Sequence, residues 1–325
     1  MLHGKEIYIF FGKYELCGIL GIFISSFLIG FLIYKVFRII SKNENIETYN
    51  DFLKYILRNK KTKVNLIESF NFIINIFLLM SFYIMIAGFS AYFKQQYNLH
   101  IYITAAIACL LCYITLSKNI EGVIKISVFL VPIIIIFIFN MGINNFQFGL
   151  NKIFNMNFNI EILPKSIVMA ILYASYNSII LFPVVISLKK YVKKNYILYI
   201  ATSISGVLVI LGIMIYSILL NGSMGIVELD MPIIYIAKVF GKIYENLYGV
   251  VIIISIFTSL ISSGYSFLKN CSKNNKQYKR YLCFICISSI FVCNIGFSKL
   301  VNLLYPVFGI LGILQIYYIL KINSY

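Results

Sequence analysis

The chain has few of the residues that enzymes use for acid–base catalysis and metal binding. Its 325 residues include 11 acidic side chains and two histidines, His3 and His100, which lie at the N-terminus and at a loop edge. The sequence contains no paired carboxylates, no nucleophile beside a base and no glycine loop suited to cradling phosphate. Because these are the groups from which catalytic sites are built, we expect a protein that is not an enzyme and uses no metal or organic cofactor.

We also expect neither a complete disulfide framework nor a cleavable signal peptide. Seven cysteines are an odd number, which argues against complete pairing. Cys109/Cys112 and Cys283/Cys286 have the spacing of metal ligands, but no histidine or acid accompanies either pair. Since a buried cysteine behaves as a small apolar residue, we interpret both pairs as packing residues. Residues 1–11 are too short and too charged for a cleavable signal.

Long runs of apolar residues dominate the sequence. Hydrophobic residues make up 61% of the sequence and charged residues 12%, a composition that excludes an ordinary soluble domain. The runs are roughly 17–26 residues long, enough to cross about 30 Å of hydrocarbon as a helix. They predict an all-α polytopic bundle of transmembrane helices in a lipid bilayer. The predicted spans are residues 16–40, 64–93, 100–117, 122–141, 166–188, 196–221, 244–268, 281–297 and 300–320.

Positive charge alternates between successive loops. Loops 35–63, 118–125, 189–194 and 269–280, with the C-terminal tail, hold eight, two, four, five and one Lys or Arg, twenty in all. Seven lie in the intervening loops: Lys13, Lys94, Lys152, Lys165, Lys238, Lys242 and Lys299. Because positive charge is retained on the cytoplasmic side, we predict a cell-membrane protein with the first group of loops and the C-terminus inside. The net charge of +17 is then a topology signal and not a nucleic-acid footprint.

Two sequence features recur at nearly one offset. Gly88, in an Ala-Gly-Phe-Ser stretch, is matched 176 residues later by Gly264 in Ser-Gly-Tyr-Ser. A lysine seven residues before Pro132 is matched by another seven residues before Pro306, and these prolines are 174 residues apart. The offset spans an odd number of helices, so the two copies run in opposite directions through the membrane, as in secondary transporters. We predict a single transmembrane domain, 1–325, with inverted-repeat halves at about 1–142 and 166–322.

Residues 173–178, Tyr-Ala-Ser-Tyr-Asn-Ser, form a polar stretch inside the predicted span 166–188. Pro183 follows this stretch within the same span. In an inverted-repeat transporter such a stretch is a broken helix that faces the substrate. The same offset places its counterpart at or before Met1, and the charge count places Lys13 outside. We therefore expect a first helix that lacks its N-terminal half, with residues 2–12 as the remainder.

Several short motifs resemble those of a known family. They are Gly4, Glu6 and Ile7 with Phe10-Phe11; residues 85–88; Tyr173 with Tyr176-Asn177 and Pro183; residues 228–232; and Tyr305-Pro306 with Gly309. Together they resemble, in order along the chain, the YkvI family of bacterial integral membrane proteins. That family is distantly related to amino acid permeases of the amino acid–polyamine–organocation superfamily. The resemblance implies a LeuT-like five-plus-five fold, although this sequence lacks the Gly-rich segment that usually precedes the first motif.

The resemblance also implies positions for ligands. A solute would bind at the substrate-binding candidates, which are Gly4, Glu6, Gly88, Tyr173, Tyr176 and Asn177. LeuT-like carriers hold sodium with adjacent hydroxyls on the seventh helix, where this chain has the ion-binding candidates Ser255, Thr258 and Ser259. Each position has a plainer alternative. Hydroxyls in membrane helices bond the preceding turn, Tyr176 and Asn177 suit interhelical packing, and water can reach Glu6 near the N-terminus.

Two functions remain open at this point. The first is a secondary transporter of a small polar solute such as an amino acid, driven by a sodium or proton gradient. The second is a non-transporting sensor, receptor subunit or remnant on the same permease fold.

Overall fold

The chain is built from helices. A computed structural model describes residues 4–43, 45–57, 63–117, 132–133, 135–144, 149, 151–153, 155–156, 158–221 and 229–322. Every regular element within these ranges is helical, which confirms the all-α prediction. The α-helices are α1 Lys5–Phe10, α2 Glu15–Lys42, α3 Tyr49–Ile56, α4 Lys63–Tyr97, α5 Ile101–Ser117, α7 Leu163–Ser187, α8 Ile197–Asn221, α9 Pro232–Val239, α10 Lys242–Cys271, α11 Asn275–Val292 and α12 Phe297–Leu320. Short 3₁₀ turns include η1 Gly12–Tyr14 and η3 Lys194–Tyr196.

Most of these helices are long and apolar enough to cross a membrane. In the described part of the chain there are 7 such spans, and Ile101–Ser117 and Ile135–Asn144 are shorter apolar helices. Eight of the nine predicted spans match a helix with each end within six residues. The ninth, 122–141, lies mostly outside the described residues, as do Lys125, Lys60 and Glu228. The chain is a multi-pass membrane protein.

The predicted break in the fifth span is wrong. Helix α7 continues without interruption from Leu163 to Ser187, through the polar stretch and through Pro183. The side chains of that stretch bond to carbonyls of their own helix: Ser175 Oγ donates to Ile171 O at 2.7 Å, and Ser178 Oγ donates to Ser175 O at 2.7 Å. Polar residues at these positions are therefore satisfied within an intact helix, and membrane helices tolerate an internal proline.

The chain folds into two compact units, each of which draws on both predicted repeat halves. The first unit comprises Met1–Ile9, Asn75–Asn155 and Met214–Leu304; the second comprises Phe10–Ile74, Met156–Ile213 and Tyr305–Tyr325. Helices α1, α4, α8 and α12 contribute residues to both units.

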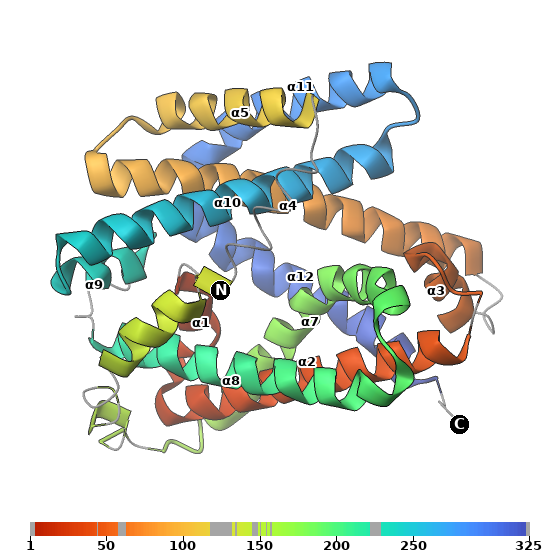
Figure 1. Cartoon of the computed structure of the whole chain (residues 1–325), viewed down its shortest axis with the longest axis horizontal. Helices are drawn as coiled ribbons and strands as arrows, with labels where there is room; N and C mark the ends of the chain where they lie inside the picture. The colour runs from red at the N-terminus through yellow and green to blue at the C-terminus, as the bar shows by residue number, and fades with distance from the viewer. Residues whose placement is uncertain are drawn as a thin grey trace. The chain divides into compact units, whose positions relative to one another are not determined.

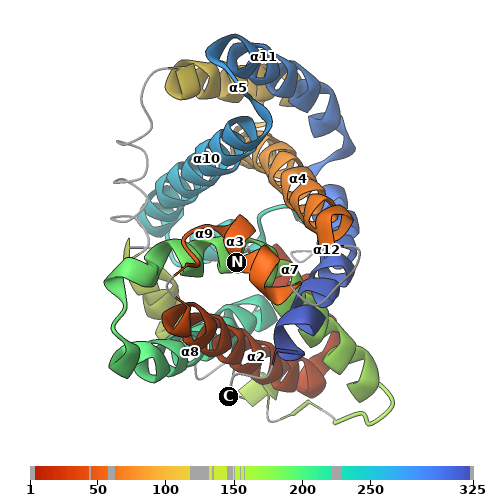
Figure 2. The ribbon, with the colours of Figure 1, turned by 90° about the vertical axis from the view of Figure 1, so that its right-hand side faces the viewer.

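In the first unit, α5 lies beside α11 and runs antiparallel to it, and α4 and α10 also run in opposite directions (Figures 1 and 2). Contacts between side chains fix these helices together. Tyr83 OH on α4 and Ser288 Oγ on α11 are 2.8 Å apart. Gly264 on α10 lies so close to α4 that an added Cβ would come within 2.9 Å of the Phe82 ring. Small residues allow such close approach between membrane helices.

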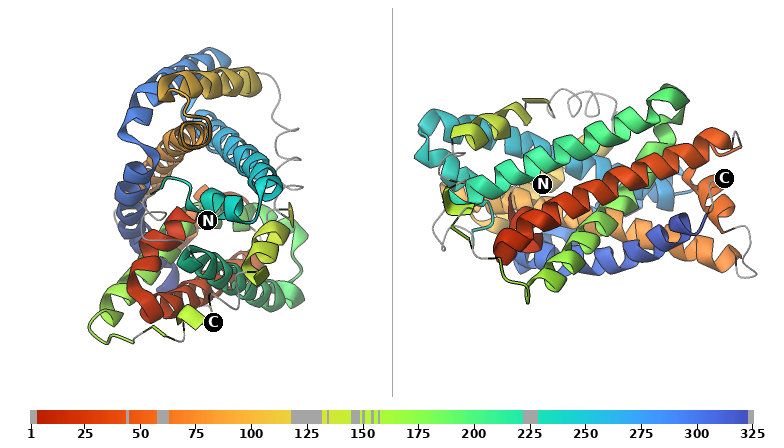
Figure 3. Two further views of the ribbon diagram at one scale, coloured as in Figure 1. Left: turned by 90° about the vertical axis from the view of Figure 1, so that its left-hand side faces the viewer. Right: turned by 90° about the horizontal axis from the view of Figure 1, so that it is seen from below.

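In the second unit, α2 packs along α7, and α8 runs beside α2 in the opposite direction (Figures 1 and 3). Here too glycines mark the closest approaches. A Cβ at Gly30 of α2 would come within 2.9 Å of Ala201 O on α8. A Cβ at Gly312 of α12 would lie 2.6 Å from the Ser175 carbonyl carbon on α7. The glycines therefore set how closely these helices pack.

Within the first unit, contacts place loops of the same charge group at the same end of the helices, as the charge alternation predicts. At one end, Tyr278 OH, at the start of α11, donates to Leu116 O near the end of α5 at 3.2 Å. The adjoining loops, 118–125 and 269–280, are both in the positively rich group. At the other end, Gln95 near the end of α4 bonds to Met231, ahead of α9, and both adjoining loops are in the poor group.

The second unit shows the same grouping. Lys189 Nζ donates to Asn43 O at 2.9 Å, and Lys35 Nζ donates to Leu320 O at 2.8 Å, which joins three positively rich segments at one end. At the other end, Ser166 Oγ donates to Cys17 O at 2.6 Å, between two segments of the poor group. Which group faces the cytoplasm stays a prediction.

Candidate solute and ion site

The predicted site residues divide between the two units. Glycines and hydroxyl residues fall in the first unit, and the aromatic and amide residues fall in the second. The first unit holds Gly4, Glu6, Gly88, Ser255, Thr258 and Ser259; the second holds Tyr173, Tyr176 and Asn177.

Gly4 and Gly88 both pack against the segment 229–233, which precedes and begins α9. Gly4 has φ +71°, and an added Cβ would lie 2.7 Å from Ile233 Cγ1. An added Cβ at Gly88 of α4 would lie 3.7 Å from Met231 Cε and 3.2 Å from the Phe297 ring. Position 4 therefore favours glycine for both space and backbone conformation, whereas a side chain at position 88 would make a tight contact with the Phe297 ring.

Three polar side chains hold the 229–233 segment in place. Lys5 Nζ donates to Leu229 O at 3.2 Å. Gln95 makes two bonds to Met231: its Nε2 donates to Met231 O at 3.1 Å, and its Oε1 accepts from Met231 N at 3.1 Å. Asp230 Oδ1 accepts from Ser298 N at 3.0 Å, at the first turn of α12. The segment thus ties α1, α4 and α12 together.

Sequence reasoning missed the roles of Lys5, Gln95 and Ser298. Residues 228–232 were identified as a motif, but nothing in their spacing shows which side chains elsewhere bind them. A signal was present in the polar character of Lys5 and Gln95 at the edges of apolar runs. Identifying their partner requires knowing which helix ends lie together.

Glu6 lies next to Lys5 near the start of α1, and both side chains are buried, at 8% and 5% exposure. Two adjacent residues of opposite charge therefore sit in an otherwise apolar helix. Burial of ionisable groups in a membrane protein is costly, and such groups commonly carry function. Glu6 stays a candidate for coupling or gating.

The hydroxyl residues of α10 do not all face the same way. Ser255 and Thr258 are buried, whereas Ser259 is exposed. Thr258 Oγ1 donates to Ser255 O at 3.0 Å, which is a bond to the preceding turn. Successive residues on a helix point about 100° apart, and here this turn leaves Thr258 buried and Ser259 exposed. Ser255 and Thr258 share a buried face and are the stronger pair of oxygen ligands.

Aromatic rings surround the polar stretch of α7 in the second unit. The Tyr176 ring stacks on Phe10 at 5.4 Å and on Tyr305 at 4.8 Å between ring centroids. Tyr173 meets Phe10 and Phe11 edge-on at 5.3 and 5.0 Å. All five rings are at most 6% exposed. Aromatic pairs in these geometries contribute roughly 0.5–1.5 kcal/mol each beyond their buried area. The cluster joins α7 to the end of α1 and to α12.

Asn177 uses its amide within its own helix. Its Nδ2 donates to Tyr173 O at 2.7 Å, one turn earlier, and its side chain is half-buried. The amide oxygen is the acceptor that remains on this side chain. Asn177 can therefore accept a hydrogen bond from a ligand amine without breaking the bond to Tyr173.

Two cysteines of the first unit make a reciprocal contact. Cys109 Sγ on α5 donates to Cys286 O on α11 at 3.2 Å, and Cys286 Sγ donates to Cys109 O at 3.8 Å. Both thiols are buried, as is Cys112, which agrees with the interpretation of these three cysteines as packing residues; Cys283 is exposed and does not fit it. Within the described residues, no group of three or more His, Cys, Asp or Glu side chains is placed to hold a metal ion.

A comparison with known proteins shows one relative over nearly the whole chain. The sequence is 23% identical over 314 residues to the uncharacterized membrane protein YkvI of Bacillus subtilis (strain 168). The match covers 94% of this chain and 86% of that protein. No family model matches the chain. The chain is similar to a bacterial membrane protein of the kind that its motifs resemble.

Proposed function

We propose that the chain is an ion-coupled secondary transporter of a small polar solute such as an amino acid, built on a LeuT-like inverted repeat. The proposal is of a carrier and not of an enzyme. The observation that carries it is the reciprocal contact between Cys109 and Cys286, whose positions differ by 177 residues. Each thiol donates to the backbone carbonyl of the other cysteine, and such an exchange of equivalent bonds is what a two-fold axis between the two helices would produce.

The offset of this contact agrees with the sequence repeat. Gly88 and Gly264 are 176 residues apart, and Pro132 and Pro306 are 174 apart. The same offset pairs α4 with α10 and α5 with α11, and both pairs run antiparallel (Figure 1). Repeats related by a two-fold axis in the membrane plane are common in secondary transporters. These observations support an inverted repeat and, through it, transport.

Two groups of residues are proposed to bind the ligands. Ser255 and Thr258, with backbone carbonyls, would supply oxygen ligands to a sodium ion, because hard cations prefer such ligands. Asn177 and the aromatic cluster of Tyr173 and Tyr176 would bind the solute, with Glu6 as the candidate for coupling. Asn177 would accept from an amine of the solute, and the rings would cover its apolar part.

The unbroken α7 favours a second candidate, a non-transporting sensor on the same fold. In the transporters that motivate the proposal, a discontinuous helix exposes backbone groups to the substrate. Here the backbone of residues 173–178 is helical throughout. A sensor needs a bound solute and a conformational response, but no passage of the solute.

Solute binding is tested by thermal stabilisation of the purified full-length chain with a panel of amino acids, in sodium and in choline buffers. We expect one class of amino acid to raise the apparent Tm in sodium more than in choline. Thr258→Ala should reduce the sodium dependence, and Asn177→Ala should raise the half-stabilising solute concentration roughly tenfold, because a contact worth about 1–3 kcal/mol is lost. Thr202→Ala is the matched control, since Thr202 Oγ1 also bonds its own helix but at an exposed position. If no amino acid shifts the Tm in any buffer, this solute class is wrong.

A further inference from the structure

A basic cavity of about 310 Å³ lies between the end of α2 and the start of α8 in the second unit. Its lining includes three cations, Arg38 and Lys42 of α2 and Lys194 of η3, and none of the lining residues that the structure describes is acidic. Tyr34, Ile197 and Leu198 complete much of the wall. The two helices run side by side here, with the last turn of α2 next to the first turn of α8 (Figure 3).

The Arg38 guanidinium is oriented by a neutral partner. It lies 5.9 Å from the centroid of the Tyr34 ring, and its Nη1 donates to Tyr34 OH at 3.5 Å. These long contacts place the guanidinium beside the ring without neutralising its charge. Arginine presents its donors as a planar fork that matches phosphate oxygens, so an oriented guanidinium is well suited to an anion.

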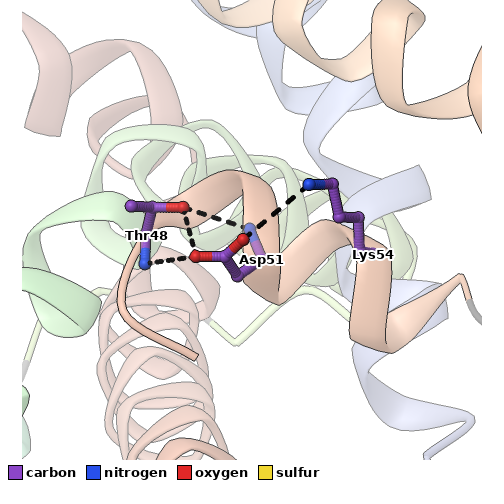
Figure 4. A network of polar contacts seen from close by, with 3 residues as sticks. All are labelled: Thr48, Asp51 and Lys54. Carbon is purple, nitrogen blue, oxygen red and sulfur yellow. Dashed lines mark hydrogen bonds and ion pairs between the residues drawn. The ribbon is translucent and has the colours of Figure 1, made fainter. Parts of the chain in front are cut away.

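An acidic side chain that lines the adjoining cavity has another role. Asp51 lines a second cavity, of about 570 Å³, that shares Lys42 with the first. Its carboxylate accepts from Thr48 Oγ1 at 2.7 Å and from Thr48 N at 3.1 Å, and it lies 3.9 Å from Lys54 Nζ (Figure 4). The Thr48 hydrogen bond holds the pKa of Asp51 below its usual value. This carboxylate therefore caps α3 and pairs with Lys54.

The edge of the basic cavity is apolar and faces outward. Leu198 is 58% exposed, and Tyr196 and Tyr199 beside it are 57% and 69% exposed. Aromatic residues at the end of an apolar membrane helix mark the level of the lipid headgroups. The cavity therefore opens where a headgroup would lie, with the acyl chains along α8.

Two simpler causes explain part of this arrangement. Cations in the last turn of α2 complement the helix dipole, and positive loops fix topology. Neither cause requires Lys194, from a different segment, to line one cavity with Arg38 and Lys42. Nor does either require an oriented guanidinium beside an exposed apolar edge.

We propose that this cavity binds the headgroup of an anionic phospholipid, with the phosphodiester between Arg38, Lys42 and Lys194. Its volume corresponds to about ten water-sized volumes, which suits a small headgroup such as phosphoglycerol. Basic pockets between membrane helices on the cytoplasmic side are known to recognise acidic headgroups. The proposal does not depend on transport.

The test is a lipid titration of the purified full-length chain in detergent, with phosphatidylglycerol or phosphatidylcholine added and the apparent Tm measured. We expect phosphatidylglycerol to raise the Tm and phosphatidylcholine to raise it far less. The triple variant Arg38→Gln, Lys42→Gln, Lys194→Gln should need at least about tenfold more phosphatidylglycerol, since each basic residue near an anionic surface contributes roughly fivefold. Arg38→Lys should give an intermediate shift, because it keeps the charge but loses the planar fork.

The matched control removes the same charge elsewhere. Lys276→Gln, Lys279→Gln, Arg280→Gln changes three exposed cations of α11 that line neither described cavity. It should respond to phosphatidylglycerol as the wild type does. Equal weakening of both triple variants would mean a diffuse charge effect and would overturn the proposal. Saturation by millimolar inorganic phosphate or glycerophosphoglycerol, with no further gain from the lipid, would assign the cavity to a soluble anion instead. Should the site variant not fold, Arg38→Gln alone and native mass spectrometry of retained lipid answer the same question.

Discussion

Gly4 occupies a position where a side chain has neither space nor a relaxed backbone conformation. Gly4→Ala places a Cβ 2.7 Å from Ile233 Cγ1 at φ +71°. Strain and overpacking cost roughly 1–3 kcal/mol each, so we expect the apparent Tm of the variant to fall by several degrees. Gly241→Ala is the control, because Gly241 has φ +118° but nothing within 4 Å of an added Cβ. A Gly4→Ala variant that is as stable as the wild type would contradict the packing of α1 on α9.

Asp230 supplies a helix cap from a distant segment. Gly296 precedes α12 and has no side chain to cap it, and Asp230 Oδ1 accepts from both Ser298 N and Ser298 Oγ. Asp230→Ala should cost about 1 kcal/mol, as lost N-caps do, and should speed hydrogen exchange in the first turn of α12. Asp230→Asn keeps an oxygen acceptor and should retain most of the protection. Equal exchange in wild type and Asp230→Ala would show that the cap does not stabilise this turn.

At the scale of helices, Gly312 controls how closely α12 approaches α7. An alanine there would put its Cβ 2.6 Å from the Ser175 carbonyl carbon, so the helices must separate. We expect Gly312→Ala to lower the apparent Tm by an amount corresponding to about 1–3 kcal/mol. Gly206→Ala is the matched control in α8, where nothing lies within 4 Å. Because alanine is the better helix former, this control should be neutral or stabilising. A reversed order of stability would contradict the α7–α12 packing.

The helices were predictable from the sequence because a fixed bilayer thickness sets their length. The predicted span 16–40 matches α2, Glu15–Lys42, and the predicted span 196–221 matches α8, Ile197–Asn221. The predicted break at 173–178 was wrong because local polarity does not distinguish an exposed backbone from side chains that bond the preceding turn. Ser175, Asn177 and Ser178 all make that second kind of bond.

The candidate site was predictable only as a set of residues. Phe10, Tyr173, Tyr176 and Tyr305 were identified as motif residues, and the structure gathers them into one ring cluster. Their contact depends on the register between α7 and α12, which no spacing in the sequence fixes. The bonds of Gln95 to Met231 were not predictable either, because no spacing in the sequence shows that the end of α4 meets the segment before α9. The roles of the predicted solute and ion residues stay predictions.

At the scale of the whole molecule, the charge alternation predicts an orientation. The loops around positions 60, 193 and 276 should be cytoplasmic, and those around 155 and 228 external. Single cysteines on a cysteine-free background, labelled in intact cells with an impermeant thiol reagent, test this. Lys193 and Asn155 are exposed and are the most informative pair. Strong labelling at 193 with none at 155 would reverse the predicted orientation.

The central claim is that the chain moves a solute and does not merely bind it. The most direct measurement is accumulation of a radiolabelled amino acid, chosen from the stabilisation screen, in proteoliposomes with an imposed sodium or proton gradient. We predict accumulation above the external concentration, its collapse when an ionophore dissipates the gradient, and a loss of sodium dependence in Thr258→Ala. Binding of the same amino acid with no accumulation under either gradient would contradict transport and establish the sensor instead.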